Sequence, residues 1–370
     1  MSSAKLIRTH FSFEQIKSVL LAFLGGGADY EWSVIGQGNI NDTFLVRNEQ
    51  GSFVIQRING AVFPNPASVA ENSALVSAHI CRTQNKTRVA AFPQILTTSD
   101  GQNFYKDNQG SIWRAQKYIE NTISYARVEN SRQALETGKC LGRFHRMVQD
   151  LPAAALTKIL PGFHNLPKYL SKFNGAWSAF SGQSSDELQF CLECINENKS
   201  FVNFFEDAVQ RGDLSLAVTH GDPKISNVLF DKKSVRALTL IDLDTVGPGL
   251  ILQDLGDCLR SCCCRTGENA FDAVTECEPD FAAQVVAGYL EEKDLSGFEH
   301  EHLYTALHLI TFELGVRFLT DYLEGNQYFK VENKDDNLRR ALIQFRLVIS
   351  IREQQDILCS LIDRAAQKHK

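Results

Sequence analysis

The sequence has no apolar run that approaches the ~20 residues needed to cross a bilayer. Its first residues, MSSAKLIRTHFSFEQIKSVLLAFL, interrupt their apolar positions with Arg8, His10, Glu14 and Lys17. They therefore lack the continuous apolar core and the small-residue cleavage site of a signal peptide. We expect an amphipathic first helix, no membrane partner and a cytoplasmic protein.

An excess of positive charge is also missing. The 370 residues include 38 Lys and Arg against 44 Asp and Glu, which gives a formal net charge of −6. This balance argues against nucleic acid or an anionic membrane as the main partner, and it is compatible with a small-molecule substrate. The hydrophobic content of 44% is ordinary for a globular protein, and the length suits two domains or lobes.

Cysteine is not scarce, since the chain has ten, but the usual signs of a disulfide framework or a zinc site are absent. Cys191 and Cys194 form a C-x-x-C in a helical pattern, and no second Cys or His pair at comparable spacing accompanies them. The cysteines of CLRSCCCR (258–265) are expected to pack as small hydrophobes. We therefore expect buried thiols and no metal bound through cysteine.

The first part of the chain has the pattern of strands around one helix. Gly, Asn and Asp turn signals separate β-prone runs, which predicts antiparallel strands at 32–35, 43–47 and 53–58. A helical pattern covers 67–82, and strands return around the turn signals SDG and DNQG.

From residue 131 onward the pattern is mainly helical. The exception is the Pro-rich segment LPAAALTKILPGFHNLPKY, which we interpret as a loop or insertion. The layout predicts an α+β fold with a small β-rich N-lobe over 1–115, a connector over 116–121 and a larger helical C-lobe over 122–370.

Polar residues with distinct chemistry lie between apolar runs in HGDPKISNVLFD (220–231) and IDLDTVGPG (241–249). Phosphoryl transfer requires a base near the acceptor hydroxyl, hard oxygen ligands for a divalent metal, and cations on the phosphates. The runs VLFD and LTLI predict a hairpin that returns Asp242 beside Asn227, close to Asp222 and Lys224. The alternative is an ordinary hairpin with solvated polar ends, because Asp, Asn, Gly and Pro favour turns.

These motifs resemble the aminoglycoside phosphotransferase/choline kinase superfamily, whose fold is protein-kinase-like. The segments GNINDTFLV, FVIQRINGAVFPNPASVAEN and ELGVRFLTDYLEGNQYFK are most similar to the N-acetylhexosamine 1-kinases of that superfamily. The resemblance implies that Asp222 is the catalytic base and that Asn227 and Asp242 bind Mg²⁺. Lys224 is the further catalytic candidate from the residues themselves, and it either contacts the transferred phosphate or only orients Asp222. His220 resembles a scaffold residue, and Asp254 resembles the helix aspartate that braces the catalytic loop.

ATP is the expected cofactor besides Mg²⁺, although the sequence has no GxxxxGK[ST] loop. GQGNIND resembles the phosphate-covering loop of the superfamily, which implicates Gly36, Gly38 and Asn39; the alternative is a plain hairpin turn. Arg57 occupies the place of the usual strand lysine, with Glu71 as its expected partner. Neighbouring Gln56 points to the opposite strand face and is the alternative nucleotide contact, and an ordinary salt bridge is a further alternative. In the lobe connector, backbone groups around Gln116 and Tyr118 are expected to contact adenine.

The resemblance places the acceptor near Arg317 and Tyr328, whereas residue spacing alone also allows an exposed ion-paired helix face. We predict a small-molecule kinase that phosphorylates a hydroxyl, by resemblance the anomeric one, of an N-acetylhexosamine. A kinase acting on choline, ethanolamine or an aminoglycoside is the alternative, and a choline site would need an aromatic cage. A non-catalytic nucleotide-binding module is a further alternative.

Overall fold

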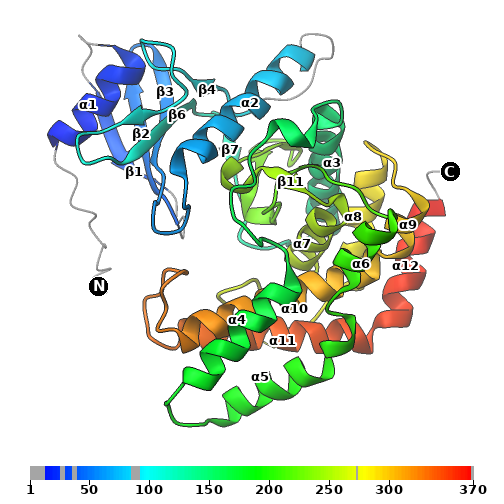
Figure 1. Ribbon diagram of the computed structural model, residues 1–370. Helices are drawn as coiled ribbons and strands as arrows, with labels where there is room; N and C mark the ends of the chain where they lie inside the picture. The colour runs from blue at the N-terminus through cyan, green and yellow to red at the C-terminus, as the bar shows by residue number, and fades with distance from the viewer. Residues whose placement is uncertain (1–12, 26–29, 36–39, 85–91, 272–273, 368–370) are drawn as a thin grey trace. The chain divides into compact units, whose positions relative to one another are not determined.

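The computed structural model describes residues 13–25, 30–35, 40–84, 92–271 and 274–367. Two compact units divide the chain. The first is built from Met1–Cys81 and Pro93–Ile119, and the second from Arg82–Phe92 and Glu120–Lys370. The predicted α+β class is confirmed, because an antiparallel sheet forms in the first unit and the second is largely helical (Figure 1).

A single antiparallel sheet is the centre of the first unit. Its strands lie in the order β1-β2-β3-β6-β4, with β5 paired to β6. The elements are α1 (Phe13–Leu24), β1 (Glu31–Val34), β2 (Asp42–Asn48), β3 (Gly51–Arg57), α2 (Pro66–Gln84), β4 (Ile95–Leu96), β5 (Tyr105–Lys106) and β6 (Ile112–Lys117). Strands β1 to β3 and helix α2 lie within two residues of their predicted bounds.

Helix α1 packs its apolar stripe against this sheet. Val19 and Leu20 from the helix join Phe44 and Trp113 from the strands in one buried cluster. The Trp113 indole would leave a polar group in that core, but its Nε1 donates to Asp107 Oδ2 at 2.8 Å.

The second unit consists of helices with two small sheets, in the strand orders β10-β9-β7 and β11-β8. Its strands and 3₁₀ turns are β7 (Thr122–Ile123), β8 (Ala217–Thr219), β9 (Val228–Asp231), β10 (Ala237–Leu240), β11 (Gly247–Gly249), η1 (Ala153–Ala155), η2 (Lys199–Phe201), η3 (Ile225–Asn227) and η4 (Leu243–Thr245). Its helices are α3 (Ser131–Val148), α4 (Leu166–Ala179), α5 (Asp186–Glu197), α6 (Phe204–Arg211), α7 (Ile251–Cys263), α8 (Pro279–Leu290), α9 (Gly297–Glu301), α10 (Leu303–Leu323), α11 (Asp336–Glu353) and α12 (Gln355–Gln367).

Close helix contacts hold this unit together. Helices α10 and α11 run side by side (Figure 1), and the rings of Phe312 and Phe345 meet across them with centroids 6.1 Å apart. Helices α3 and α8 approach more closely, because glycines stand at the contact. A Cβ on Gly138 would lie 2.0 Å from the Val285 carbonyl oxygen, and one on Gly288 would lie 2.0 Å from that of Leu135.

The Pro-rich segment after α3 is only partly the predicted loop. Helix α4 begins at Leu166, within that segment, and Pro167 occupies its first turn. Proline is accepted there because the N–H groups of the first turn have no partner within the helix. Asn165 caps the helix, its side chain accepting a hydrogen bond from the Lys168 N–H at 2.9 Å.

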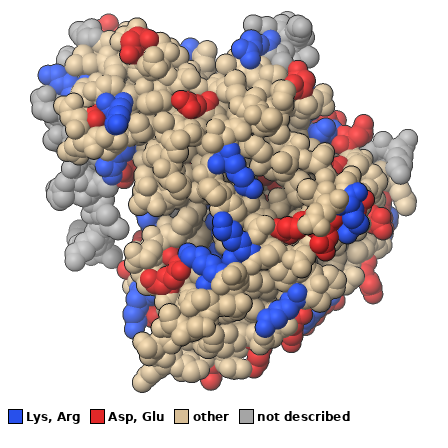
Figure 2. All heavy atoms as spheres, in the orientation of Figure 1, with Lys and Arg blue, Asp and Glu red and all other residues tan. Residues whose placement is uncertain are grey.

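All ten cysteines are free thiols, and all but Cys81 and Cys359 are buried. Burial raises the pKa of both Cys191 and Cys194 to about 12. These thiols are therefore protonated at neutral pH, and an uncharged thiol can pack as a small hydrophobic side chain. Among the described residues, no helix combines the length and the apolar character needed to cross a membrane. On the face shown in Figure 2, Lys and Arg side chains are interspersed with Asp and Glu.

Candidate active site

The polar residues of the two motifs are brought together by a hairpin of the second unit. Strand β8 leads into the loop that begins at His220, and η3 ends at Asn227 where β9 starts. Strand β10 pairs antiparallel with β9, and the Ile241 N–H donates to the Asn227 carbonyl oxygen at 2.8 Å. This hydrogen bond brings Asp242, the next residue, beside Asn227 as the sequence predicted.

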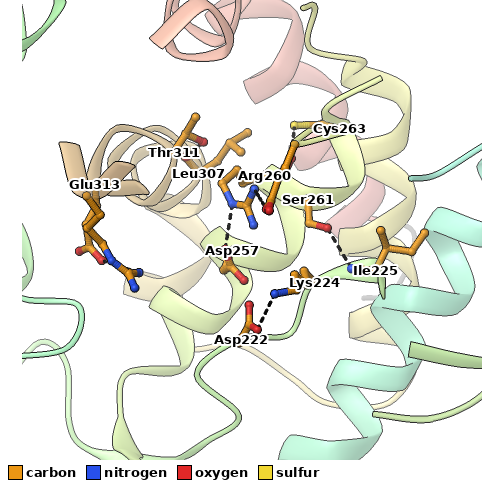
Figure 3. A network of polar contacts seen from close by, with 12 residues as sticks. Asp222, Lys224, Ile225, Asp257, Arg260, Ser261, Cys263, Leu307, Thr311 and Glu313 are labelled. Atoms are coloured by element: carbon orange, nitrogen blue, oxygen red, sulfur yellow. Dashed lines mark hydrogen bonds and ion pairs between the residues drawn. The ribbon is translucent and has the colours of Figure 1, made fainter. Parts of the chain in front are cut away.

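Asp222, Lys224 and Asn227 contact one another directly. Lys224 Nζ donates to Asp222 Oδ2 at 2.7 Å, a pair shown in Figure 3, and Asn227 Nδ2 donates to the same oxygen at 3.0 Å. Asn227 Nδ2 also donates to the Asp222 carbonyl oxygen at 2.8 Å. Burial opposes the charge on Lys224, but the nearby Asp222 and Glu268 carboxylates outweigh burial and raise its pKa. Lys224 is therefore an ammonium ion at neutral pH.

Asp254 on α7 stabilises the loop that begins at His220. Its Oδ2 accepts the His220 N–H at 2.7 Å, and its Oδ1 accepts the Gly221 N–H at 2.9 Å. His145 on α3 lies with Nε2 3.0 Å from Asp254 Oδ2, while Nδ1 lies 3.0 Å from the Tyr289 hydroxyl. Burial opposes ionisation of Asp254, but the hydrogen bond and charge of His145 lower its pKa. Sequence reasoning missed His145, which is distant in the chain and has no local motif.

The ring of His220 contacts backbone atoms on both sides. Its Nε2 lies 3.0 Å from the Ile241 carbonyl oxygen, and its Nδ1 accepts the Asp222 N–H at 3.3 Å. Burial lowers the pKa of His220, which favours the neutral ring that these two contacts require. Gly221 is in the left-handed region with φ +84, where a Cβ would lie 2.9 Å from Thr245. Only glycine fits this turn without strain.

Asp242 also has left-handed backbone geometry, with φ 67. A non-glycine residue in this region is uncommon and is maintained by its surroundings, often at functional sites. The carboxylate of Asp242 and the amide oxygen of Asn227 are hard oxygen donors, which suit Mg²⁺ and not a soft metal.

A second polar network, which sequence reasoning did not single out, lies next to Asp222. Arg260 Nε donates to Asp257 Oδ1 at 2.8 Å, and its Nη1 donates to Glu268 at 2.8 Å. Figure 3 shows Asp257 between Arg260 and the Asp222–Lys224 pair. Burial raises the pKa of Asp257, and the Asp222 carboxylate adds to this effect. The spacing of Asp257 and Arg260 in DLGDCLR was the only available signal.

Arg317 lies inside α10's buried face and is not part of an exposed ion-paired surface, because only 14% of its side chain is exposed. Four aromatic rings surround its guanidinium carbon with centroids 5.2 to 5.9 Å away: Phe163, Tyr169, Tyr328 and Phe329. Asp321, one helical turn further on, accepts the N–H groups of Gln327, Tyr328 and Phe329. It thereby fixes the loop that presents Tyr328 to Arg317.

Glu313 joins this cluster to the catalytic loop through a histidine that sequence reasoning missed. His164 Nδ1 lies 2.9 Å from Glu313 Oε1, and His164 Nε2 lies 3.3 Å from the Gly221 carbonyl oxygen. Burial opposes protonation of His164, but the Glu313 carboxylate outweighs it and raises the pKa.

The nucleotide contacts predicted in the first unit are described only in part. Gly36, Gly38 and Asn39 lie outside the described residues. Arg57 forms an ion pair with Asp42 on β2, in which Nη2 and Nε both donate to Oδ2, at 2.7 and 3.0 Å, while the predicted partner Glu71 is exposed on α2. Salt bridges of this kind form where facing strand residues carry opposite charge, and Asp42 is the register partner of Arg57.

The polar connection between sheet and helix α2 is made instead by Gln56 and Arg114. Gln56 Oε1 accepts hydrogen bonds from Arg114 Nε at 3.0 Å and Nη2 at 2.8 Å. Arg114 Nη1 donates to Ser73 Oγ on α2 at 2.8 Å, and Arg114 is 2% exposed. This network joins the sheet to α2, the connection for which the sequence predicted Arg57 and Glu71.

Gln116 and Tyr118 lie at the end of β6, half-buried. The Lys117 N–H donates to Gln94, and the Tyr118 N–H donates to Ser52, both at 2.9 Å. Adenine binding here stays a prediction. Because these two N–H groups already donate within the protein, other groups of this segment would have to bind adenine.

Comparison with known proteins adds a family assignment. A profile described as the phosphotransferase enzyme family matches residues 31–304. Among solved structures, an aminoglycoside phosphotransferase from Alicyclobacillus acidocaldarius is 16% identical, with a TM-score of 0.60 over 99% of this chain and 98% of that one. A choline kinase from Cryptosporidium parvum is 14% identical, with a TM-score of 0.53 over 90% and 92%.

A spectinomycin phosphotransferase in complex with ADP and spectinomycin is 15% identical, with a TM-score of 0.56 over 93% of this chain and 98% of that one. Such low identities establish the fold and not the substrate. They confirm the predicted protein-kinase-like architecture, in which an antiparallel sheet is followed by a largely helical part.

Proposed function

The chain belongs to the phosphotransferase enzyme family of small-molecule kinases with an alcohol group as acceptor, and we propose that it phosphorylates an N-acetylhexosamine. The acceptor would be N-acetylglucosamine or N-acetylgalactosamine, and the reacting group the anomeric hydroxyl. The observation that carries the proposal is the direct contact of Asp222 with Lys224 and Asn227, with Asp242 held beside them.

Asp222 would orient the acceptor hydroxyl and accept its proton as the oxygen attacks the γ-phosphorus, while the bond from that phosphorus to the β,γ-bridging oxygen breaks and ADP leaves. Its carboxylate is 31% exposed, so a hydroxyl can reach it. Lys224 is charged and bonded to one oxygen of Asp222. It would keep the base oriented in the resting enzyme through that contact and would stabilise charge on the transferred phosphoryl group.

Asn227 and Asp242 would hold Mg²⁺, which neutralises the charge of the triphosphate when bound. The two residues fit that ion, because Mg²⁺ typically takes one or two protein oxygen ligands and completes its shell with phosphate and water. The Asn227 amide nitrogen donates to Asp222, and this orientation leaves the amide oxygen as the ligand.

In the first unit, Gly36, Gly38 and Asn39 would cover the phosphates and Gln116 and Tyr118 would contact adenine. Arg57 is the proposed phosphate contact in preference to Gln56, because Gln56 is engaged with Arg114 in a buried network. Arg57 is 34% exposed and remains a permanent cation beside Asp42. We propose no contact between Glu71 and Arg57. Because Glu71 lies on the exposed face of α2, its contact with ATP would have to come from that face.

Arg317 and Tyr328 are the proposed acceptor contacts. A quaternary ammonium such as choline requires an aromatic cage that is free to receive a cation. Here the four rings already surround a cation, the Arg317 guanidinium. A second cation in that cluster would be repelled, whereas hydroxyl and amide oxygens of a neutral sugar can accept hydrogen bonds from arginine. The arrangement therefore favours the sugar over choline.

An acceptor panel tests this proposal. The full chain is incubated with ATP and Mg²⁺ and with N-acetylglucosamine, N-acetylgalactosamine, choline, ethanolamine or kanamycin, and products are followed by phosphorus NMR. We expect a sugar phosphate whose phosphorus couples to the anomeric proton. Arg317→Lys should raise the sugar KM about tenfold or more with little change in the KM for ATP, because lysine cannot replace the planar guanidinium. Transfer to choline, ethanolamine or kanamycin but not to the sugars would contradict the acceptor assignment.

A further inference from the structure

A pocket separate from the proposed reacting groups lies within the second unit. It has a volume of about 320 Å³ between the segment 158–165, helix α6 and the β8/β11 ribbon, and we call it the α6 pocket (α6 and β11 are labelled in Figure 1). Its lining shares Phe163, Gly221 and Asp254 with the site described above, but it includes none of Asp222, Lys224, Asn227 or Arg317. Small-molecule sites in proteins typically have volumes from roughly 300 Å³ upward, so the α6 pocket has room for a compact ligand.

The α6 pocket reaches the catalytic loop through His164, which lines it together with Gly221. His164 has a φ of 54, an uncommon value for a residue with a side chain. Three contacts hold it there: Glu313 on Nδ1, the Gly221 carbonyl on Nε2, and Gln253 Nε2, which donates to the His164 carbonyl at 2.9 Å. Relaxation of its backbone would break the contact with Gly221, the residue before Asp222. His164 therefore connects the wall of the α6 pocket to the loop that contains Asp222.

Apolar side chains form most of the remaining wall. Ile159 and Phe205 are buried in it, while Val209 and Leu216 are 40% and 59% exposed. A single exposed hydrophobic residue is common on a protein surface, but here two of them line the same hollow. The wall suits the apolar body of a ligand.

The carboxyl group of Glu206 determines which polar group of that ligand can bind in the α6 pocket. Glu206 lines the pocket; its Oε1 accepts Asn165 Nδ2 at 2.8 Å, and its Oε2 is buried with no hydrogen-bond partner in the described part of the chain. Burial raises the pKa of Glu206, and the Glu313 and Asp207 carboxylates add to this effect against the opposing Lys158. Because the terminal torsion of glutamate turns readily, Oε2 can meet a donor that enters the pocket.

We propose that the α6 pocket is an effector site for a small organic amine, with the ammonium group on Glu206 and the apolar body against Ile159, Phe205 and Leu216. The amine closes the segment 158–165 against α6 and favours the strained, bonded arrangement of His164. His164 then holds Asp222 in place through Gly221, and phosphoryl transfer to the acceptor is faster. The coupling to catalysis rests on the proposed function, whereas binding of the amine does not.

Calorimetry on the full chain without nucleotide tests the binding step. The probe is 2-phenylethylamine, compared with the neutral 2-phenylethanol of the same shape. We expect the amine to bind about tenfold more tightly or better, as a charge-assisted hydrogen bond provides. Glu206→Gln should remove this difference. Asp207→Asn is the matched control, because it removes the same charge from the next residue of α6, which does not line the pocket, and should retain it.

Equal binding of amine and alcohol, or an amine affinity that Glu206→Gln leaves unchanged, would overturn the effector site. Asp222→Asn separates the α6 pocket from the acceptor site: amine binding should persist in that variant, and its loss would place the amine beside Asp222 and overturn the proposal.

The coupling is measured as kcat/KM for sugar phosphorylation with and without saturating amine. We expect an increase of about fivefold in the unsubstituted enzyme and in Asp207→Asn, and none in Glu206→Gln. An unchanged or lower value in the unsubstituted enzyme would refute the coupling through His164. If no sugar is phosphorylated either with or without amine, the acceptor assignment has failed, and the calorimetric result still decides the α6 pocket by itself.

Discussion

Gln56 and Arg57 are neighbours on β3, yet the structure gives them different environments. Successive side chains of a strand point to opposite faces. Gln56 accepts two hydrogen bonds from the buried Arg114, while Arg57 pairs with Asp42 near the surface. The first residue therefore supports the sheet, and the second is the proposed phosphate contact.

Alanine substitutions at these two positions should separate stability from nucleotide binding. Gln56→Ala is expected to lower the free energy of unfolding by about 1–3 kcal/mol, because it removes the acceptor of two hydrogen bonds from a buried guanidinium. Arg57→Ala should cost under about 1 kcal/mol, as partly exposed ion pairs do, but should raise the KM for ATP severalfold. Denaturant unfolding and ATP titration of the initial rate measure the two effects. The reverse pattern would assign the phosphate contact to Gln56.

At the residue scale, the catalytic loop was predictable because its polar residues are close in sequence. Asp222, Lys224 and Asn227 share one motif, and the hairpin pattern placed Asp242 beside them. His145 and His164 could not be predicted in the same way. Each reaches the loop from more than fifty residues away in the chain, and a single sequence contains no record of such contacts. The ion-pair partner of Arg57 was missed because Asp42 depends on strand register and not on sequence spacing.

At the scale of elements, the contact between α3 and α8 depends on residues without side chains. The extra methyl group of alanine at Gly138 or Gly288 would collide with a carbonyl oxygen of the facing helix. Since backbone atoms cannot rotate away, the helices would have to separate, and the buried contact between them would lose packing.

The same substitution should therefore have opposite effects at two helical glycines. Gly138→Ala is expected to destabilise the protein by about 1–3 kcal/mol, because overpacking exceeds the gain in helix propensity. Gly175→Ala in α4 is the matched control. It meets no atom within 4 Å and is exposed, so it should stabilise by up to about 1 kcal/mol. Thermal and denaturant unfolding measure both changes, and a neutral Gly138→Ala would show that the helices are not in close contact.

Most elements followed from periodicity and turn signals, while element ends required tertiary context. Strands β1 to β3 and helix α2 were predicted within two residues because alternation and turn residues define them locally. Helix α4 begins inside the Pro-rich segment for which the sequence predicts a loop or insertion, because Asn165 and Pro167 together form a good helix start. The crossing of α3 and α8 was not predictable, since several helices contain glycine and only packing shows which ones face a partner.

At the scale of the whole molecule, the proposed functions are distributed over both units. The proposed base, metal ligands and acceptor contacts belong to the second unit, and the proposed phosphate and adenine contacts belong to the first. The family and the fold were predictable because the motifs span residues 36 to 330. The acceptor was not determined by sequence, because no spacing rule indicates that four aromatic rings surround Arg317.

We propose Asp222 as the base of a metal-dependent phosphoryl transfer. The most direct test compares single-turnover transfer from ATP to the acceptor in the unsubstituted enzyme, in Asp222→Ala and in the isosteric Asp222→Asn, with ATP affinity measured by calorimetry. Both variants should lose at least about 10²–10⁴-fold in transfer rate while the Kd for ATP changes less than about threefold. Transfer at a near-normal rate in either folded variant would contradict the role of Asp222 as the base.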